Sequence, residues 1–255
     1  MLKKDYPILE FDPGKTALIE PHMIRIPLTI PERVVLCFFH DIIEKLFQTG
    51  RAKIAGQIKT EMGIHPIYIV NENGVECALF NPGIGGPLAG YMLEELIALG
   101  GRKFIACGGA GVLDKQLAVG HLLVPYAAVR DEGLSYHYLA PARDVEVDPE
   151  CLAKVFKVLD RHQCQYLRVK TWTTDAFFRE TKDKIQLRKD EGCLAVDMEC
   201  ASLCAVAQFR GVKFAQILYG GDDISCDEWD HRCWNTREEI REQVLWLAVE
   251  AVKEL

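Results

Sequence analysis

The sequence lacks several features that would each define a class of protein. It has no long basic run and a formal net charge of −7, which argues against a nucleic-acid partner because such partners require clustered positive charge. No apolar run is long enough to span a bilayer. The start, residues 1–7, lacks the apolar region of a signal peptide. We therefore expect a cytoplasmic protein that binds neither nucleic acid nor membranes.

The sequence also lacks the spacing of a metal site. Most of its ten cysteines lie within hydrophobic stretches, where cysteine behaves as a small buried side chain. Cys226, His231 and Cys233 are the only local group of soft ligands, and no pair has zinc-finger spacing. We expect reduced thiols, no metal ion and no organic cofactor.

Length and periodicity predict an α/β protein. A chain of 255 residues corresponds to one large α/β domain or two small ones, and it contains no internal repeat or linker. Short hydrophobic runs alternate with helical patterns, which predicts a mixed, largely parallel sheet. The predicted strands are Val34–Phe39, Ile67–Val70, Val75–Phe80, Lys103–Cys107, Leu122–Val129, Leu167–Thr171, Cys193–Val196 and Phe214–Tyr219.

Helix boundaries are also marked in the sequence. We predict helices that start at Pro87 and after the cap residue Asp148, and a helix over Met198–Arg210 that stops at Gly211. Thr236 begins a capping-box pattern that predicts the start of the final helix.

An acid, a methionine and a second acid stand where a predicted strand meets an alanine-rich helix. In extended backbone, Asp197 and Glu199 point the same way. Two carboxylates can bind adjacent hydroxyls of a sugar, and the thioether of Met198 can lie under its apolar face. The alternative is an acid pair that stabilises a helix start, with Asp197 as a cap.

Other motifs also follow predicted strands. They are Gly83–Gly86, Gly108–Gly111 and Asp222. Ligands of open α/β sheets bind at the carboxyl ends of strands, so these segments predict one shared pocket.

The pattern over Asp197–Ala201 resembles the ribose-binding motif of the nucleoside phosphorylase family, which includes uridine phosphorylases, hexameric purine nucleoside phosphorylases and related hydrolases. Asn81–Pro87, Gly108–Leu113 and Gly220–Asp223 resemble further family segments and occur in family order. The resemblance implies a three-layer α/β/α fold with a central mixed sheet that partly closes into a barrel. It also implies that residues 1–255 form a single domain.

The resemblance implies roles for the acids. Glu199 and Met198 would bind the ribose, with Asp197 in place of a longer glutamate. Asp222 occupies the position of the acid that protonates or hydrogen-bonds the base in purine-acting members, and a buried carboxyl can do so near neutrality. Asp223 is the alternative acid. Glu199 and Asp222 are therefore the predicted catalytic residues.

Two further segments, Ala128–Tyr138 and Thr171–Thr181, resemble regions that line the base pocket in relatives. Phe177 is the candidate for stacking on the base. The Gln-x-Arg pattern that reads uracil is absent after Phe177, which leaves both purine and uridine-like bases open. Candidates for base or sugar contacts are Glu132, His137 and Arg179.

The chain departs from the family in its phosphate-binding groups. Ala106 and Gly109 stand in place of an arginine and a hydroxyl residue, and the family's Gly-Asp-Pro-x-x-Arg loop is missing after the first strand. Backbone N–H groups of the glycine segments, among them Gly85, Gly108 and Gly109, can still cradle an anion. Compensating charge could come from Arg25, Arg33, Arg51 or a neighbouring subunit.

The sequence thus predicts a nucleoside phosphorylase, a pentosyltransferase that uses inorganic phosphate to release a uridine-like or purine base and ribose 1-phosphate. A nucleoside N-ribohydrolase that uses water is the alternative, because hydrolytic relatives also lack the arginine that Ala106 replaces. A non-catalytic nucleoside-binding protein is the third possibility. Relatives form dimers and hexamers, so we expect a homo-oligomer.

Overall fold

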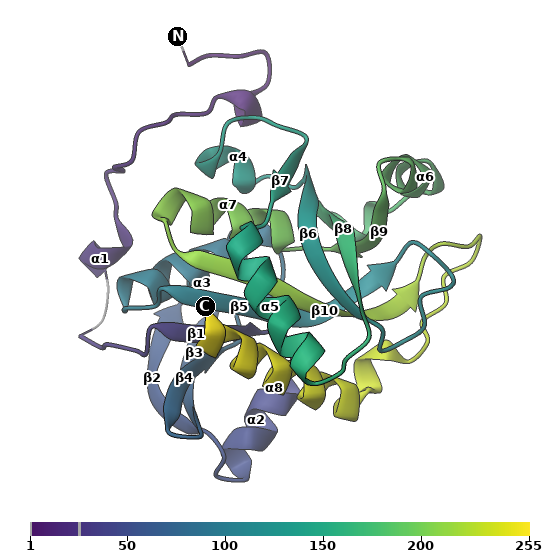
Figure 1. The fold of residues 1–255 in the computed structure, drawn as a ribbon. Helices are drawn as coiled ribbons and strands as arrows, with labels where there is room; N and C mark the ends of the chain where they lie inside the picture. The colour runs from purple at the N-terminus through teal and green to yellow at the C-terminus, as the bar shows by residue number, and fades with distance from the viewer. Residues whose placement is uncertain (1, 25–26) are drawn as a thin grey trace.

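The computed structural model describes residues 2–24 and 27–255, and in these residues ten strands form one sheet (Figure 1). Along the sheet the order is β10-β6-β8-β9-β5-β1-β4-β3-β2, and β7 pairs with β6. The strands are β1 (Arg33–Cys37), β2 (Lys53–Thr60), β3 (Gly63–Glu72), β4 (Val75–Phe80), β5 (Lys103–Val112), β6 (Leu122–Asp131), β7 (Asp144–Glu146), β8 (Tyr166–Thr174), β9 (Cys193–Asp197) and β10 (Lys213–Asp223).

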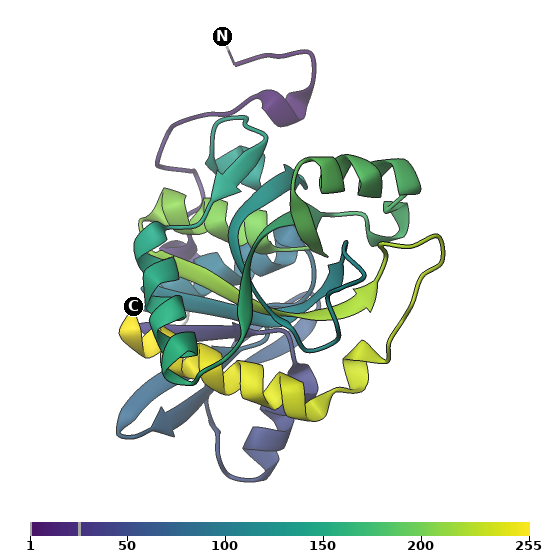
Figure 2. The same ribbon diagram turned by 45° about the vertical axis from the view of Figure 1, so that its right-hand side comes forward.

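Helices cover both faces of this sheet, which gives three layers. On one face α3 packs against α7, and on the other α5 and α8 pack together with α2 against α8 (Figures 1 and 2). The helices are α1 (Pro21–Ile24), α2 (His40–Gln48), α3 (Gly86–Ala98), α4 (Ser135–Tyr138), α5 (Pro149–Arg161), α6 (Lys182–Asp190), α7 (Cys200–Arg210) and α8 (Glu238–Glu254), with 3-10 turns η1 (Pro7–Leu9), η2 (Phe177–Arg179) and η3 (Trp234–Thr236). The expected α/β/α layering is confirmed.

Strand β5 belongs to two parts of the sheet. Its first half lies between β1 and β10, whereas Gly111 and Val112 pair with β9. Through the pairs β10–β6, β6–β8 and β8–β9, the strands β5, β10, β6, β8 and β9 close into a ring. The predicted partial barrel is therefore present. On one edge of β5, the pairing with β1 ends at Cys107 and the pairing with β9 begins at Gly111.

All eight predicted strands are found, and six of them, β3, β5, β6, β8, β9 and β10, run further than expected. Strand β5 continues to Val112, so Gly108–Gly111 belong to the strand and do not follow it as the sequence had suggested. Glycine fits here because its neighbours pack closely: a Cβ on Gly109 would lie 3.1 Å from Cζ3 of Trp234. Strands β2 and β7 were not predicted from the sequence.

The structure shifts two predicted helix starts slightly: α3 starts at Gly86 instead of Pro87, and α7 starts at Cys200 instead of Met198. Helix α5 starts at Pro149, and Asp148 accepts a hydrogen bond from the N–H of Glu150 at 2.8 Å. Helix α7 ends before Gly211, whose φ is 69°. The capping box at Thr236 is absent, because α8 starts at Glu238 without a side-chain cap. Instead, the hydroxyl of Thr236 donates to the Cys233 carbonyl at 2.9 Å.

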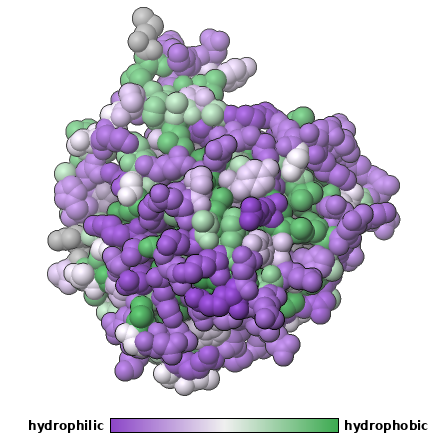
Figure 3. All heavy atoms as spheres, in the orientation of Figure 1, coloured by the Kyte–Doolittle hydropathy of each residue, from purple (hydrophilic) through white to green (hydrophobic). Residues whose placement is uncertain are grey.

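The core lies on both faces of the central strands, where consecutive residues Val34, Val35 and Leu36 are all fully buried. The outer surface of the face that carries α5 and α8 is mostly hydrophilic (Figure 3). Within residues 2–24 and 27–255, no helix has both the length and the apolar character needed to cross a bilayer. In the same residues, no group of three or more metal-binding side chains is arranged to hold an ion.

The Asp197 carboxylate joins β8, β9 and α7. Its Oδ1 accepts from the hydroxyls of Thr171 and Thr173 at 3.2 and 2.9 Å. Its Oδ2 accepts from the N–H groups of Glu199 and Cys200 at 3.2 and 2.6 Å. All four donors lie in the buried interior. Asp197 therefore serves the helix start, which was the alternative interpretation of this residue.

We expect Asp197→Ala to leave these four donors without an acceptor. Unpaired buried donors are costly, so the free energy of unfolding should fall by about 3 kcal/mol or more in urea titrations. Asp148→Ala is the matched control, because it removes an aspartate from a more exposed helix start and should cost about 1 kcal/mol. Equal losses in the two variants would contradict the proposed anchoring role.

Candidate functional site

A cavity of about 380 Å³ lies at the carboxyl ends of β5, β9 and β10. This size suits a small organic ligand. The residues that line it are Phe38, Phe39, Ile84, Gly108, Gly109, Ala110, Gly111, Phe177, Glu180, Val196, Asp197, Met198, Glu199, Gln216, Leu218, Asp222, Trp234, Asn235 and Arg241. The strand ends that the sequence predicted to share a pocket do meet here.

Most of the predicted site residues are brought together in this cavity. Seven of them line it: Phe177, Gly108, Gly109, Asp197, Met198, Glu199 and Asp222. Gly85 adjoins it, because its N–H donates to Oε1 of Glu199 at 2.7 Å. The backbone of Gly85 has a φ of 92°, a conformation that favours glycine.

Three candidates for base or sugar contacts lie elsewhere. The Glu132 carboxylate is buried and accepts from the Ser135 N–H at 3.0 Å and from the hydroxyls of Ser135 and Ser202. Arg179 is exposed and does not line the cavity. His137 lines a different cavity, of about 610 Å³, beside the N-terminal segment. Because its carboxylate contacts both Ser135 and Ser202, Glu132 stabilises the start of α4 against α7.

In the segment Asp197–Glu199, here called the sugar motif, Glu199 is the acid with free hydrogen-bonding capacity. It is 7% exposed, and its Oε1 accepts from the N–H of Gly85 at 2.7 Å. Burial, together with the charge of Asp197, raises the pKa of Glu199 to about 8, although the N–H groups of Gly85 and Met198 oppose this shift.

Asp197 differs from Glu199 because its oxygens are already used. Burial raises its pKa, while its four hydrogen-bond donors oppose the change. Its carboxylate contributes to the cavity wall but has little capacity left for a ligand. Only Glu199 of the two motif acids is thus available for a sugar hydroxyl.

Asp222 and Asp223 point to different environments. Asp222 lines the cavity, and its Oδ2 accepts from the indole N–H of Trp229 at 2.7 Å. Asp223 does not line it, since its carboxylate pairs with Arg232 and accepts from the Ser225 N–H at 2.7 Å. Of the two acids that the sequence left open, Asp222 is the one that faces the cavity.

Glu180 was not predicted from the sequence. It directly follows η2 and lines the cavity together with Phe177 and Asp222. Burial, reinforced by the negative charge of Asp222, raises the pKa of Glu180 to about 7. Its position three residues after Phe177, inside a segment already suspected of lining the base pocket, is the signal that could have found it.

Arg241 on α8 was also missed, and it is the only arginine or lysine that lines the cavity within the described part of the chain. Its Nη1 donates to the Asp41 carboxylate at 2.7 Å and to the Asn235 carbonyl at 2.9 Å. Its guanidinium lies 4.9 Å from the ring centre of Phe39. Nothing near position 241 in the sequence marks it as a site residue.

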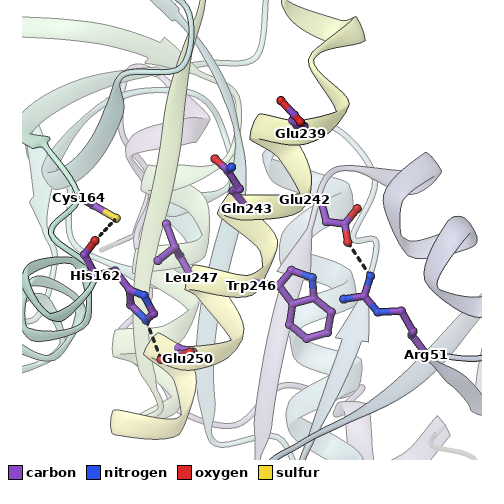
Figure 4. A pocket seen from close by; sticks show the side chains of 9 residues that line it. All are labelled: Arg51, His162, Cys164, Glu239, Glu242, Gln243, Trp246, Leu247 and Glu250. Atoms are coloured by element: carbon purple, nitrogen blue, oxygen red, sulfur yellow. Dashed lines mark hydrogen bonds and ion pairs between the residues drawn. The ribbon is translucent and has the colours of Figure 1, made fainter.

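The arginines suggested by the sequence do not reach this cavity. Arg33 pairs with Glu32 at 3.3 Å, and Arg25 lies outside the described residues. Arg51 pairs with Glu242 at 2.7 Å in a separate cavity of about 510 Å³ beside α8 (Figure 4). In that second cavity His162 also contacts Glu250, at 3.0 Å, so its charged groups largely satisfy one another (Figure 4).

An indole covers the part of the cavity where the resemblance leads one to expect a phosphate contact. A Cβ added to Gly109 would lie 3.1 Å from Cζ3 of Trp234. A Cβ added to Gly221 would lie 3.2 Å from Cβ of Trp234. Ala106 is fully buried and stands in register with Gln216 on β10. Gln216 is 0% exposed and neither of its amide atoms has a hydrogen-bond partner. Neither Ala106 nor Gly109, the two positions that depart from the family, supplies a positive charge.

The chain is similar in sequence and in fold to several known proteins. Guanosine phosphorylase of Halorubrum lacusprofundi is 26% identical over 197 residues, which cover 75% of this chain and 81% of the relative. Uridine phosphorylase of Vibrio fischeri has a similar structure, with a TM-score of 0.73, 20% identity and coverage of 94% of this chain and 98% of that one. AMP nucleosidase of Bacteroides thetaiotaomicron is also similar, with a TM-score of 0.68, 22% identity and coverage of 86% of both chains.

The two structures share the fold at low identity, whereas the family assignment comes from the sequence itself. The sequence model of the phosphorylase superfamily matches residues 33–254, a span that contains every residue lining the cavity. The chain belongs to the phosphorylase superfamily.

Proposed function

We propose that this protein cleaves the N-glycosidic bond of a nucleoside in the 380 Å³ cavity. The observation that carries this proposal is the buried Glu199, whose Oε1 is held by the N–H of Gly85, beside Met198 and in the same cavity as Asp222. Sugar hydroxyls that donate to Glu199 would favour its ionised form, and the carboxylate would then stabilise positive charge on the ribose in the transition state.

We further propose that water is the nucleophile, which makes the protein a nucleoside N-ribohydrolase. Three carboxyl groups with free capacity line the cavity, on Glu180, Glu199 and Asp222. Arg241 is their only cationic counterpart in the described residues, and Asp41 already offsets its charge. Such a cavity offers a phosphate dianion little positive charge, whereas a neutral water molecule needs none.

Nucleoside phosphorylase remains the second candidate, and Arg241 favours it. The Nε of Arg241 is buried without a hydrogen-bond partner, so an anion that enters the cavity would find a free guanidinium donor. The curated relative from Halorubrum lacusprofundi is named a guanosine phosphorylase. A second copy of the chain could add a further arginine if the protein forms the homo-oligomer that we expect.

The first prediction separates these two reactions. We expect release of base from at least one of adenosine, inosine, uridine and thymidine in phosphate-free buffer, with free ribose as the second product. Millimolar phosphate should leave the rate unchanged. Cleavage that requires phosphate and gives ribose 1-phosphate would instead establish a phosphorylase, and absence of cleavage in both arms would leave a binding protein.

The second prediction concerns Glu199. In Glu199→Gln the charge at the sugar motif is lost while the size is kept, so kcat/KM for the best nucleoside should fall about 100-fold or more. Steady-state kinetics would measure this loss. The matched control is Glu191→Gln, since Glu191 pairs with Arg143 and Arg188 away from the cavity. Similar kinetics for both variants would remove Glu199 from the proposed mechanism.

The third prediction is a pH dependence of stability without ligand. Because the pKa of Glu199 is raised to about 8 in the folded protein, its contribution to stability is present below the ordinary glutamate pKa. That contribution is lost as the pH rises through about 8. We expect the wild-type Tm to fall relative to that of Glu199→Gln between pH 5 and pH 8, as followed by calorimetry. Parallel Tm curves would show that Glu199 does not titrate in this range.

A further inference from the structure

The cavity contains two carboxyl groups whose surroundings differ. One oxygen of Asp222 accepts a hydrogen bond from Trp229 at 2.7 Å. Glu180 lines the same cavity, but its carboxyl has no hydrogen-bond or ion-pair partner within residues 2–24 and 27–255. Its oxygens are therefore free to contact a ligand, whereas Oδ2 of Asp222 is already held by an N–H donor.

Within the described residues, Arg241 is the only arginine or lysine that lines the cavity with Glu180, and it pairs with Asp41 at 2.7 Å. Arg179, the neighbour of Glu180 in the chain, is exposed, and the Lys182 ammonium pairs with Asp227 at 2.7 Å. Further along α6, Lys184 pairs with Asp131 at 2.9 Å. The charge that acts on Glu180 is that of Asp222, and together with burial it raises the pKa of Glu180 to about 7.

Two neighbouring carboxyls with unlike surroundings divide the roles of acid and base between them. At neutral pH Glu180 can therefore hold a proton while Asp222 accepts hydrogen bonds. Both line the same cavity as Phe177, the residue expected to stack on the base.

We propose that Glu180 is the catalytic acid that protonates the leaving base, while Asp222 accepts a hydrogen bond from the base. This inference rests on the proposed hydrolysis of a nucleoside. It also specifies the substrate, because a 6-aminopurine presents an acceptor, N7, next to a donor, the 6-amino group, on one edge. Glu180 would donate to N7 and Asp222 would accept from the amino group.

The reaction balances with water as the only co-reactant. The bond from C1′ to N9 breaks, its electron pair stays with the purine, and the proton of Glu180 moves to N7. The oxygen of water forms the new bond to C1′, and the proton that this water loses restores Glu180 by way of solvent. The products are ribose and the neutral base.

The test compares two leaving groups in Glu180→Gln. Adenine needs a proton as it departs, whereas p-nitrophenolate does not. We expect kcat/KM for adenosine to fall about 100-fold or more, as for loss of a general acid. For p-nitrophenyl β-D-riboside the value should stay within about threefold of wild type. Asp183→Asn, an exposed carboxyl at the start of α6, is the matched control and should leave both substrates unchanged.

The pH profile and Asp222→Asn complete the test. Wild-type cleavage of adenosine should decline above about pH 7, and Glu180→Gln should lack this decline. In Asp222→Asn the preference for adenosine over inosine should shrink. Equal losses on both leaving groups in Glu180→Gln, or a leaving-group dependence found only in Asp222→Asn, would overturn the assignment.

Two further results would separate this inference from the function on which it rests. A wild-type protein that cleaves p-nitrophenyl β-D-riboside and adenosine, with Glu180→Gln equally active, would overturn the role of Glu180 and leave hydrolysis in place. A wild-type protein that cleaves neither substrate would overturn both. Inosine cleaved faster than adenosine would overturn the choice of a 6-aminopurine.

Discussion

The four hydrogen bonds of the Asp197 carboxylate hold the catalytic end of this sheet together. They tie two hydroxyls of β8 to the first N–H groups around the start of α7, at the strand where the barrel closes. Glu199 follows two residues later, so its backbone is fixed by the same carboxylate that neighbours its side chain. Burial raises the pKa of Glu199, and the Asp197 carboxylate, which adds to this shift, also positions its backbone. Structure and reactivity at the sugar motif depend on one side chain.

Local signals in the sequence predicted much of the fold and part of the cavity. Consecutive apolar residues marked the central strands, and the strand-to-helix junction at Asp197–Glu199 marked the sugar motif. The predictions failed where distant packing decides the outcome. Gly108 to Gly111 continue β5 because β9 and β10 pair with them, and Thr236 bonds back to Cys233 instead of capping α8. Arg241 and Glu180 reach the cavity only through the packing of α8 and η2, which no local pattern records.

The electrostatic character of the cavity follows from where its charges find partners. Arg232 neutralises Asp223 outside the cavity, and Asp41 offsets Arg241 at its wall. Glu180 and Glu199 have no cationic partner among the residues that the structure describes. Burial then makes ionisation of these two acids costly, which keeps protons available inside a protein with net charge −7. A cavity of this kind favours leaving groups that take up a proton and nucleophiles that carry no charge.

The segment of residues 224–237 contacts three separate groups around the cavity. Trp229 donates to Asp222, Arg232 pairs with Asp223, and Trp234 lies against Gly109. The segment is a surface connection between β10 and α8, outside the layers that form the core. In evolutionary terms the segment can vary as a unit. A change of its length or sequence would alter both the orientation of Asp222 and the space beside Gly109. Descendants of one scaffold could in this way diverge in chemistry while their sheet stays intact.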